Sequence, residues 1–258
     1  MSHTEQLQHA LVLHARPWRE TSLIVDLFTE HYGKIAVCAR GVRSKKSPKR
    51  SILQPLSPLY ICWKGRGELP TLTVVEAAEP VIKLSSNSLY SSFYINELLM
   101  RLLHKHDPHP QLFRHYKTAL NRLSVPEDLE KTLREFELEL LTAIGYGLTL
   151  DHDFMDKPIS TQKMYFLNSD GQLQNVDHVG YVDSADSLDS LDSVNKNNTT
   201  SSVNPRLFSG QHLISISEKK WHDEATLKDA KRLLRISLKS LLGDKPLQSR
   251  KLFRSKTS

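Results

Sequence analysis

Six cationic side chains and no carboxylate fall within eleven consecutive residues near the N-terminus, in the sequence ARGVRSKKSPKR at 39–50. Lysine and arginine neutralise phosphates and release condensed counterions, which supplies most of the sequence-independent affinity of proteins for nucleic acids. Solvated loops and protein-docking patches also carry charge runs, so both alternatives stay open. The predicted phosphate-binding residues are Arg40, Arg43, Lys45, Lys46, Lys49 and Arg50, and we expect Arg16, Lys34, Lys64 and Arg66 to extend this surface.

A second group of cations recurs at intervals of three and four residues near the C-terminus, which places the group on one face of a predicted helix. Leucines at Leu227, Leu234 and Leu238 face elsewhere. A basic stripe beside apolar side chains suits capture of an acidic, hydrophobic peptide end as well as it suits DNA. An ordinary amphipathic surface helix has the same pattern. The stripe consists of Lys228, Lys231, Arg232, Arg235 and Lys239.

The best candidate for catalysis is the sequence DHDFMD, which offers Asp151, His152, Asp153 and Asp156, with His178 further along. Carboxylates and a histidine could hold a divalent ion, as in metal-dependent nucleases. An acidic loop after a helix explains the same residues, because such clusters are weakly specific. The chain lacks a GxSxG elbow, a Walker loop, a GxGxxG motif after a strand and any CxxC pair. We therefore expect no cofactor and no structural zinc finger.

Charge and composition favour polyanionic partners. The formal net charge is +6, and the basic ends flank a region, 151–217, with 4 Lys or Arg against 9 Asp or Glu. A basic surface makes nucleic acid the first partner to consider. No apolar run approaches the roughly 20 residues that cross a bilayer, and no secretory signal is evident. Cys38 and Cys62 are expected to be buried free thiols, and the three tryptophans, Trp18 among them, to pack in the core. We predict a cytoplasmic protein without a membrane segment.

The first 80 residues contain five short segments rich in β-branched and apolar residues, at 11–15, 22–30, 34–40, 57–63 and 71–77. Alternating residues in the second and third segments share one face, and Gly33 between them can supply the positive φ of a hairpin turn. Five strands in about 80 residues suit an OB-fold barrel. The basic stretch then falls in the connection between the third and fourth strands.

Past residue 80 the apolar period becomes helical. Stripes predict helices over 89–106, 112–123, 124–144 and 223–242, the third with a capping box at Ser124 and Glu127. A small hairpin is predicted at 164–174, and the D-S-rich segment 180–204 has the composition of a disordered linker. The predicted fold class is α+β, with a five-stranded OB-fold barrel at 1–80 followed by a helical domain at 81–258 that carries a small irregular insert.

Several long stretches make the chain resemble RecO, the family of bacterial DNA repair and recombination mediators, and most closely its gammaproteobacterial members. The resemblance covers nearly the whole chain outside 180–204. The stretches that carry it are VLHARPWRETSLIVDLFTEHYGK (12–34), ARGVRSKKS (39–47), LQPLSPL (53–59), GRGELPTL (65–72), LYSSFYINELLMRLL (89–103), FELELLTAIGYG (136–147) and KPLQSRKLF (245–253).

The resemblance implies an N-terminal OB-fold, a helical domain and no enzymatic turnover. It implies binding of single- and double-stranded DNA, annealing of complementary strands, and action with RecR to load the RecA recombinase onto DNA coated by single-strand-binding protein. By position, the barrel cations Arg40, Arg43, Lys45 and Lys46 would contact DNA. The helical domain would bind the acidic C-terminal tail of single-strand-binding protein through Arg134 and Lys228. Cytoplasmic, nucleoid-associated localisation would follow.

One departure from the family concerns zinc. Many members carry four zinc-binding cysteines after the helix that ends in the GYG-like stretch, whereas residues 151–179 here contain none. We therefore expect a degenerate, metal-free module. Two other interpretations stay open: a metal-dependent nuclease that uses Asp151, His152 and Asp153, and a docking adaptor for acidic protein tails.

Overall fold

A computed structural model describes residues 4–44, 47–80, 82–178 and 206–254. The chain forms two compact units, Met1–Gly147 with Lys239–Ser258, and Leu148–Leu238. The division at residue 80 between barrel and helical domain stays a prediction, and the proposed linker at 180–204 lies outside the described residues. In those described ranges, no helix is both long and apolar enough to cross a membrane.

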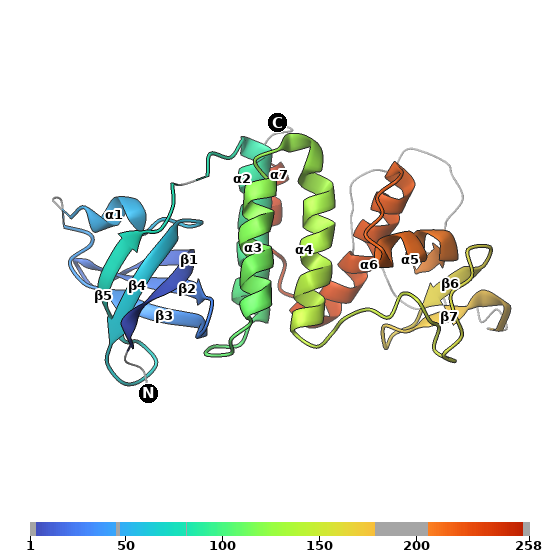
Figure 1. Cartoon of the computed structure of the whole chain (residues 1–258), viewed down its shortest axis with the longest axis horizontal. Helices are drawn as coiled ribbons and strands as arrows, with labels where there is room; N and C mark the ends of the chain where they lie inside the picture. Colours follow the sequence, from blue (N-terminus) through green and yellow to red (C-terminus); the bar gives the residue numbers. More distant parts are fainter. Residues whose placement is uncertain (1–3, 45–46, 81, 179–205, 255–258) are drawn as a thin grey trace. The chain divides into compact units, whose positions relative to one another are not determined.

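The N-terminal part of the first unit is a closed barrel of five strands in the order β1-β2-β3-β5-β4, which confirms the predicted OB-fold (Figure 1). Neighbouring strands are antiparallel, except that β3 and β5 meet in parallel at Cys38 and Thr71. The strands are β1 (Thr4–Trp18), β2 (Ser22–Thr29), β3 (Gly33–Ala39), β4 (Pro58–Lys64) and β5 (Thr71–Ala77). The first strand is much longer than the predicted 11–15, because it pairs with both β2 and β4 and bends at a register shift between Val12 and His14.

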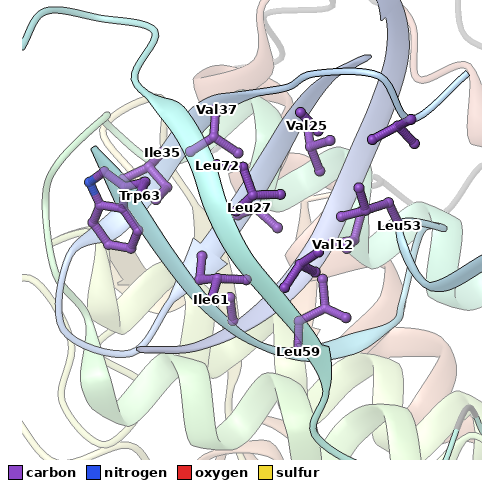
Figure 2. Packing of buried hydrophobic residues seen from close by; sticks show 14 residues of the cluster. Val12, Val25, Leu27, Ile35, Val37, Leu53, Leu59, Ile61, Trp63 and Leu72 are labelled. Carbon is purple, nitrogen blue, oxygen red and sulfur yellow. The ribbon is translucent and has the colours of Figure 1, made fainter. Parts of the chain in front are cut away.

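Alternating side chains fill the barrel. Val25 and Leu27 from β2 and Ile35 and Val37 from β3 point into one buried cluster with residues of β4 and β5 (Figure 2). This is the period-two pattern that the sequence predicts. Each such side chain contributes about 1.5–3 kcal/mol when it is fully removed from water. The barrel core therefore forms a rigid base for the loops at its rim.

Gly33 begins β3 with φ +65, as the predicted hairpin turn requires. A Cβ atom at this position would lie 2.1 Å from the carbonyl oxygen of Asp107. The position therefore requires glycine for its backbone conformation and for its space.

The first unit also contains helices α2 (Ser86–Leu102), α3 (Pro110–Arg122), α4 (Leu129–Ala143) and α7 (Ser249–Arg254). The three predicted helices of this region are confirmed, and α7 was not predicted. The predicted capping box at Ser124 is wrong, because Pro126–Asp128 form a short 3-10 turn and α4 begins after Asp128. The Ser124 hydroxyl instead donates to the carbonyl of Asn121 at 2.6 Å and closes the end of α3.

Helices α2 and α3 cover the outer face of β1 and β2. The Phe28 ring packs edge-on against Phe113 at 5.5 Å between centroids. The buried amide of Asn96 donates to the carbonyl of Leu13 at 2.9 Å, and its oxygen accepts a hydrogen bond from the Tyr116 hydroxyl. This polar bridge fixes the helices on the barrel, because buried polar groups without partners are costly.

The second unit contains a small sheet in the order β7-β6-β8, with strands β6 (Met164–Leu167), β7 (Leu173–Asn175) and β8 (Leu207–Ser209). The predicted hairpin at 164–174 is confirmed, whereas β8 and helix α5 (Gly210–Ser217) were not predicted. Helix α6 (Glu224–Leu242) matches the fourth predicted helix, and Gly243 follows it with φ +63.

Candidate nucleic-acid interface

The basic loop, residues 40–50, is a shaped part of the barrel in its described portion. Val42 is 0% exposed and belongs to the barrel core, which fixes the loop just after β3. The loop ends in the short helix α1 (Lys49–Ile52), and the next residue, Leu53, is also buried in that core. Both ends are therefore anchored by apolar packing. Lys45 and Lys46 lie outside the described residues.

Arg43 ties the basic loop to the turn between β1 and β2. Its backbone N–H donates to the carbonyl of Thr21 at 2.8 Å, and its guanidinium Nη1 donates to the carbonyl of Arg19 at 3.0 Å. Arg19 has φ 51, in the left-handed region. These bonds hold two cation-bearing loops together at one end of the barrel.

A cleft of about 630 Å³ opens beside this connection. The turn after β1 lines one side, the end of β3 lines another, and the residues leading into β5 complete it. In OB-folds the loops between strands 1 and 2 and between strands 4 and 5 flank the oligonucleotide-binding surface, and this cleft occupies that position. Its lining includes Trp18, Arg19, Glu20, Cys38, Arg40 and Leu69.

Charge and wall structure make the cleft suitable for an anion. Two arginines, Arg19 and Arg40, line it against one acidic residue, Glu20. The N–H of Cys38 donates to the carbonyl of Pro70 at 2.8 Å, which joins the two walls at the base. Both cysteines are free thiols, as predicted, but only Cys62 is buried, and Cys38 is partly exposed at the cleft.

Trp18 was expected in the core, and that expectation is wrong. Its side chain is 41% exposed at the end of β1, whereas Trp63 is buried in the barrel (Figure 2). Arg19 was not predicted as a site residue. The signal that could have identified both is the sequence WRET, a tight turn in which the pairing of Trp18 with Ser22 leaves the intervening residues at the rim.

Lys34 lies away from the cleft. It is the second residue of β3, and Arg40 follows the same strand, so the two are about 20 Å apart at roughly 3.3 Å per residue. Its ammonium is half-buried and donates to the carbonyl of Met100 at 2.6 Å. Burial lowers the pKa of Lys34, which the charge of Asp26 partly opposes. The structure therefore gives Lys34 a role in attaching β3 to α2.

The remaining predicted DNA-binding residues of the barrel have different surroundings. Arg16 forms an ion pair with Asp26 at 2.8 Å, which reduces the charge it presents. Arg66 is exposed in the turn between β4 and β5 but does not line the cleft. Lys49 and Arg50 lie on α1 and continue the basic loop from Arg43.

Arg134, predicted to contact an acidic protein tail, lies inside the helical part of the first unit. Its side chain is 9% exposed and its Nη2 atom lies 2.9 Å from Oε1 of Glu137. The Tyr94 hydroxyl donates to the same carboxylate oxygen at 2.6 Å. Burial and the Glu137 charge raise the pKa of Tyr94 well above its ordinary value.

The predicted stripe on α6 is divided. Lys228, Lys231 and Arg235 are exposed, and Lys228 forms an ion pair with Glu224 at 2.8 Å. Arg232 instead packs inward: its guanidinium lies 4.5 Å above the Phe208 ring and 2.9 Å from Asp229. The outward-facing cations of the stripe in the second unit are therefore Lys228, Lys231 and Arg235.

The acidic cluster has a structural explanation in its own loop. Asp153 is buried, and its Oδ1 atom accepts hydrogen bonds from the N–H groups of Met155 at 2.9 Å and Lys157 at 3.0 Å. Asp151 contacts His152 at 3.2 Å. Among the described residues no group of three or more His, Cys, Asp or Glu side chains is placed to hold a metal ion. The side chain of His178 lies outside that description.

Comparisons with known proteins agree along nearly the whole chain. Residues 1–81 match the family model Recombination protein O N terminal, and residues 85–251 match Recombination protein O C terminal. The chain is 39% identical to the DNA repair protein RecO of Glaesserella parasuis serovar 5, over 97% of this chain and 96% of that protein. It is 40% identical to the DNA repair proteins RecO of Haemophilus influenzae (strain Rd) and Pasteurella multocida, in each case over 96% of this chain and 95% of the relative. The chain therefore belongs to the recombination protein O family, RecO.

Proposed function

We propose that this protein acts in DNA repair and recombination as a non-enzymatic mediator that binds DNA and anneals complementary strands. Its relatives are named DNA repair protein RecO. The observation that carries the proposal is the anchored basic loop, joined by Arg43 to the turn at Arg19 beside a cleft at the rim of an OB-fold. Arrays of fixed cations at such a rim attract phosphate backbones.

Annealing requires two polyanionic strands to approach each other. Cations of the basic loop lower the repulsion between two backbones, while base edges remain free to pair. No covalent bond changes in this process, so it needs no nucleophile and no general base.

The second part of the proposal is partner handling. We infer that the helical domain captures the acidic C-terminal tail of single-strand-binding protein, and that the protein acts with RecR to load RecA onto coated DNA in the cytoplasm, at the nucleoid. The exposed cations Lys228, Lys231 and Arg235 support tail capture by charge. The proposed contribution of Arg134 has to act from a buried position.

An annealing assay with complementary labelled oligonucleotides tests the first part. We expect faster annealing with the protein than without it, in EDTA, and a decline with rising salt. Unchanged strand lengths on a denaturing gel exclude cleavage as the cause of a signal change. The nuclease interpretation would instead be supported if the protein did not anneal strands but cut them in the presence of a metal ion, and if Asp153→Asn abolished the cutting.

Strands precoated with single-strand-binding protein test the second part. We expect annealing to continue on strands coated with the intact protein and to fall on strands coated with a form that lacks its acidic tail. Equal annealing on strands coated with the intact and the tail-less protein would contradict tail capture. The proposal that the protein binds DNA would still stand. Binding of the acidic tail without any binding of DNA would favour the pure docking adaptor.

A further inference from the structure

The cleft at the barrel rim has one wall that phosphate binding does not explain. Trp18 is a large aromatic side chain, 41% exposed, at a cleft whose lining is mostly polar and charged apart from Leu69 and Cys38. Aromatic side chains contribute most stability when buried, so the exposed position carries no benefit to the barrel core. The three tryptophans differ in this respect, since Trp63 packs in the core and Trp221 is half-buried.

We propose that the cleft is a subsite for one unpaired nucleobase, which stacks on Trp18 while its flanking phosphates lie on Arg19, Arg40 and Arg43. This rests on the proposed DNA binding and specifies its substrate class. An aromatic face beside fixed cations is the arrangement with which proteins hold single strands, at about 1–3 kcal/mol for each stacked base. The cleft volume of about 630 Å³ falls within the roughly 300–1,000 Å³ typical of small-ligand sites.

The position of Trp18 is fixed by the backbone on both sides. Trp18 pairs with Ser22 across the tight β1–β2 turn, so its place at the rim follows from strand register. The Arg43 bonds to Arg19 and Thr21 fix the turn itself against the basic loop. A stacking platform held this way loses little entropy when a ligand binds.

The subsite would distinguish unpaired from paired DNA. In a duplex the bases are already stacked on their neighbours, and extruding one costs a few kcal/mol. A base in a single strand enters without that cost. One stacked base per protein also leaves the adjacent bases free, so strands held in this way can still find their complement.

Three variants and two oligonucleotides test the subsite. Wild type, Trp18→Ala and Trp221→Phe are titrated with oligo-dT and with an abasic oligomer of the same length, which keeps the phosphates and lacks bases. We expect Trp18→Ala to bind oligo-dT roughly fivefold to a hundredfold more weakly, with unchanged affinity for the abasic oligomer. Trp221→Phe is the matched control and should behave as wild type with both.

Two spectroscopic and chemical readouts locate the base. We expect oligo-dT, but not the abasic oligomer, to quench tryptophan fluorescence in wild type and in Trp221→Phe, with the quenching lost in Trp18→Ala. Cys38 lines the same cleft, so oligo-dT should slow its alkylation by a small thiol reagent, with the buried Cys62 as internal reference.

The outcomes separate the subsite from DNA binding itself. Equal affinity of wild type and Trp18→Ala for oligo-dT overturns the subsite while the proposed function stands. Loss of both oligomers by Trp18→Ala also overturns it, because Trp18 then supports the loop. Failure of wild type to bind either oligomer contradicts the proposed DNA binding. If an acidic tail peptide, and not oligo-dT, protects Cys38 from alkylation, the cleft binds a protein partner and the inference is overturned.

Discussion

The guanidinium of Arg43 donates a hydrogen bond to the backbone carbonyl of Arg19 over 3.0 Å, across 24 residues of sequence. The bond joins the basic loop to the first turn of the barrel and uses one of the five guanidinium N–H groups of Arg43. Four other guanidinium N–H groups remain for outside acceptors. Arg43 can therefore hold the loop in place and still face a phosphate.

Charge reversal in the basic loop should weaken DNA binding and flatten its salt dependence. We expect the triple variant Arg43→Glu, Lys45→Glu and Lys46→Glu to reduce the log–log salt slope for single-stranded DNA by about 2, at roughly 0.7 per lost phosphate contact. Fluorescence anisotropy across a salt titration measures the slope. The charge-matched control is Lys157→Glu, Lys163→Glu and Lys220→Glu in the second unit. An identical slope in both triple variants would remove the loop from the interface.

Lys34→Met should lower stability and leave DNA affinity nearly unchanged. The Lys34 ammonium donates to the Met100 carbonyl at 2.6 Å, and its loss leaves that acceptor without this donor. We expect a decrease of about 1–2 kcal/mol in the free energy of unfolding. Urea denaturation and DNA titration of the same preparation check both points. A large loss of DNA affinity with unchanged stability would return Lys34 to the interface.

Removing the buried bridge between barrel and helices should be more costly. Asn96→Leu leaves both the Leu13 carbonyl and the Tyr116 hydroxyl without this partner, and we expect about 2–4 kcal/mol of destabilisation. Tyr116→Phe removes one bond only and should cost about 1–2 kcal/mol. Denaturant unfolding of the two variants side by side gives the order. The reverse order would show that the Tyr116 hydroxyl contributes more to stability than the whole Asn96 side chain does.

Local sequence patterns predicted much of the fold. Alternation in β2 and β3 identified their inward faces, and the glycine between them identified the hairpin, because both signals depend on residues that are near in sequence. The capping box failed since Pro126 belongs to a 3-10 turn and α4 begins only after Asp128. Strand β8 was missed because it is three residues long and is stabilised by pairing with β6.

The site was only partly predictable, for reasons that are tertiary. The charge density of the basic loop was visible in the sequence, but its attachment to Arg19 depends on a contact between distant segments. Trp18 follows an apolar strand and therefore resembles a core residue until the end of the strand is placed at the rim. Lys34 looked like a surface cation, because nothing local indicates that a helix carbonyl will accept its hydrogen bond. Arg134 has Glu137 three residues away, but the burial of this pair depends on tertiary packing.

Stability should rise with pH through the lowered pKa of His9. Burial, with a contribution from Lys117, lowers the pKa of His9 below its ordinary 6.5, against opposing effects of Glu79 and Glu30. Between the lowered pKa of folded His9 and the ordinary pKa of 6.5 in the unfolded chain, the unfolded chain binds more protons. Stability therefore increases with pH in that window, and His9 adds no pH dependence above about 6.5. We expect His9→Phe, which keeps a ring against Phe113, to flatten this slope.

Denaturant unfolding from about pH 5 to about pH 8 measures the His9 contribution. His31→Phe, at an exposed position of the β2–β3 turn, is the matched control and should retain the wild-type slope. Equal slopes in His9→Phe and wild type would assign the pH dependence to other groups.

Arg134→Ala and Lys228→Ala should both weaken capture of an acidic tail peptide while DNA affinity stays constant, but their effects on stability should differ. Arg134→Ala leaves the buried Glu137 carboxylate without its cation and should cost about 3–5 kcal/mol. Lys228 is 72% exposed and pairs with Glu224 at the surface, so Lys228→Ala should leave stability nearly unchanged.

Glu137→Gln separates the two effects at Arg134. Glu137→Gln disturbs the buried Arg134–Glu137 pair but keeps the Arg134 cation. If Arg134 contacts the tail, the tail peptide should bind weakly to Arg134→Ala and almost normally to Glu137→Gln. Anisotropy of a labelled tail peptide, measured where each variant is fully folded by circular dichroism, makes the comparison. Equal loss in both variants would mean that the buried ion pair maintains the helix packing and that the tail contacts only outward cations such as Lys228.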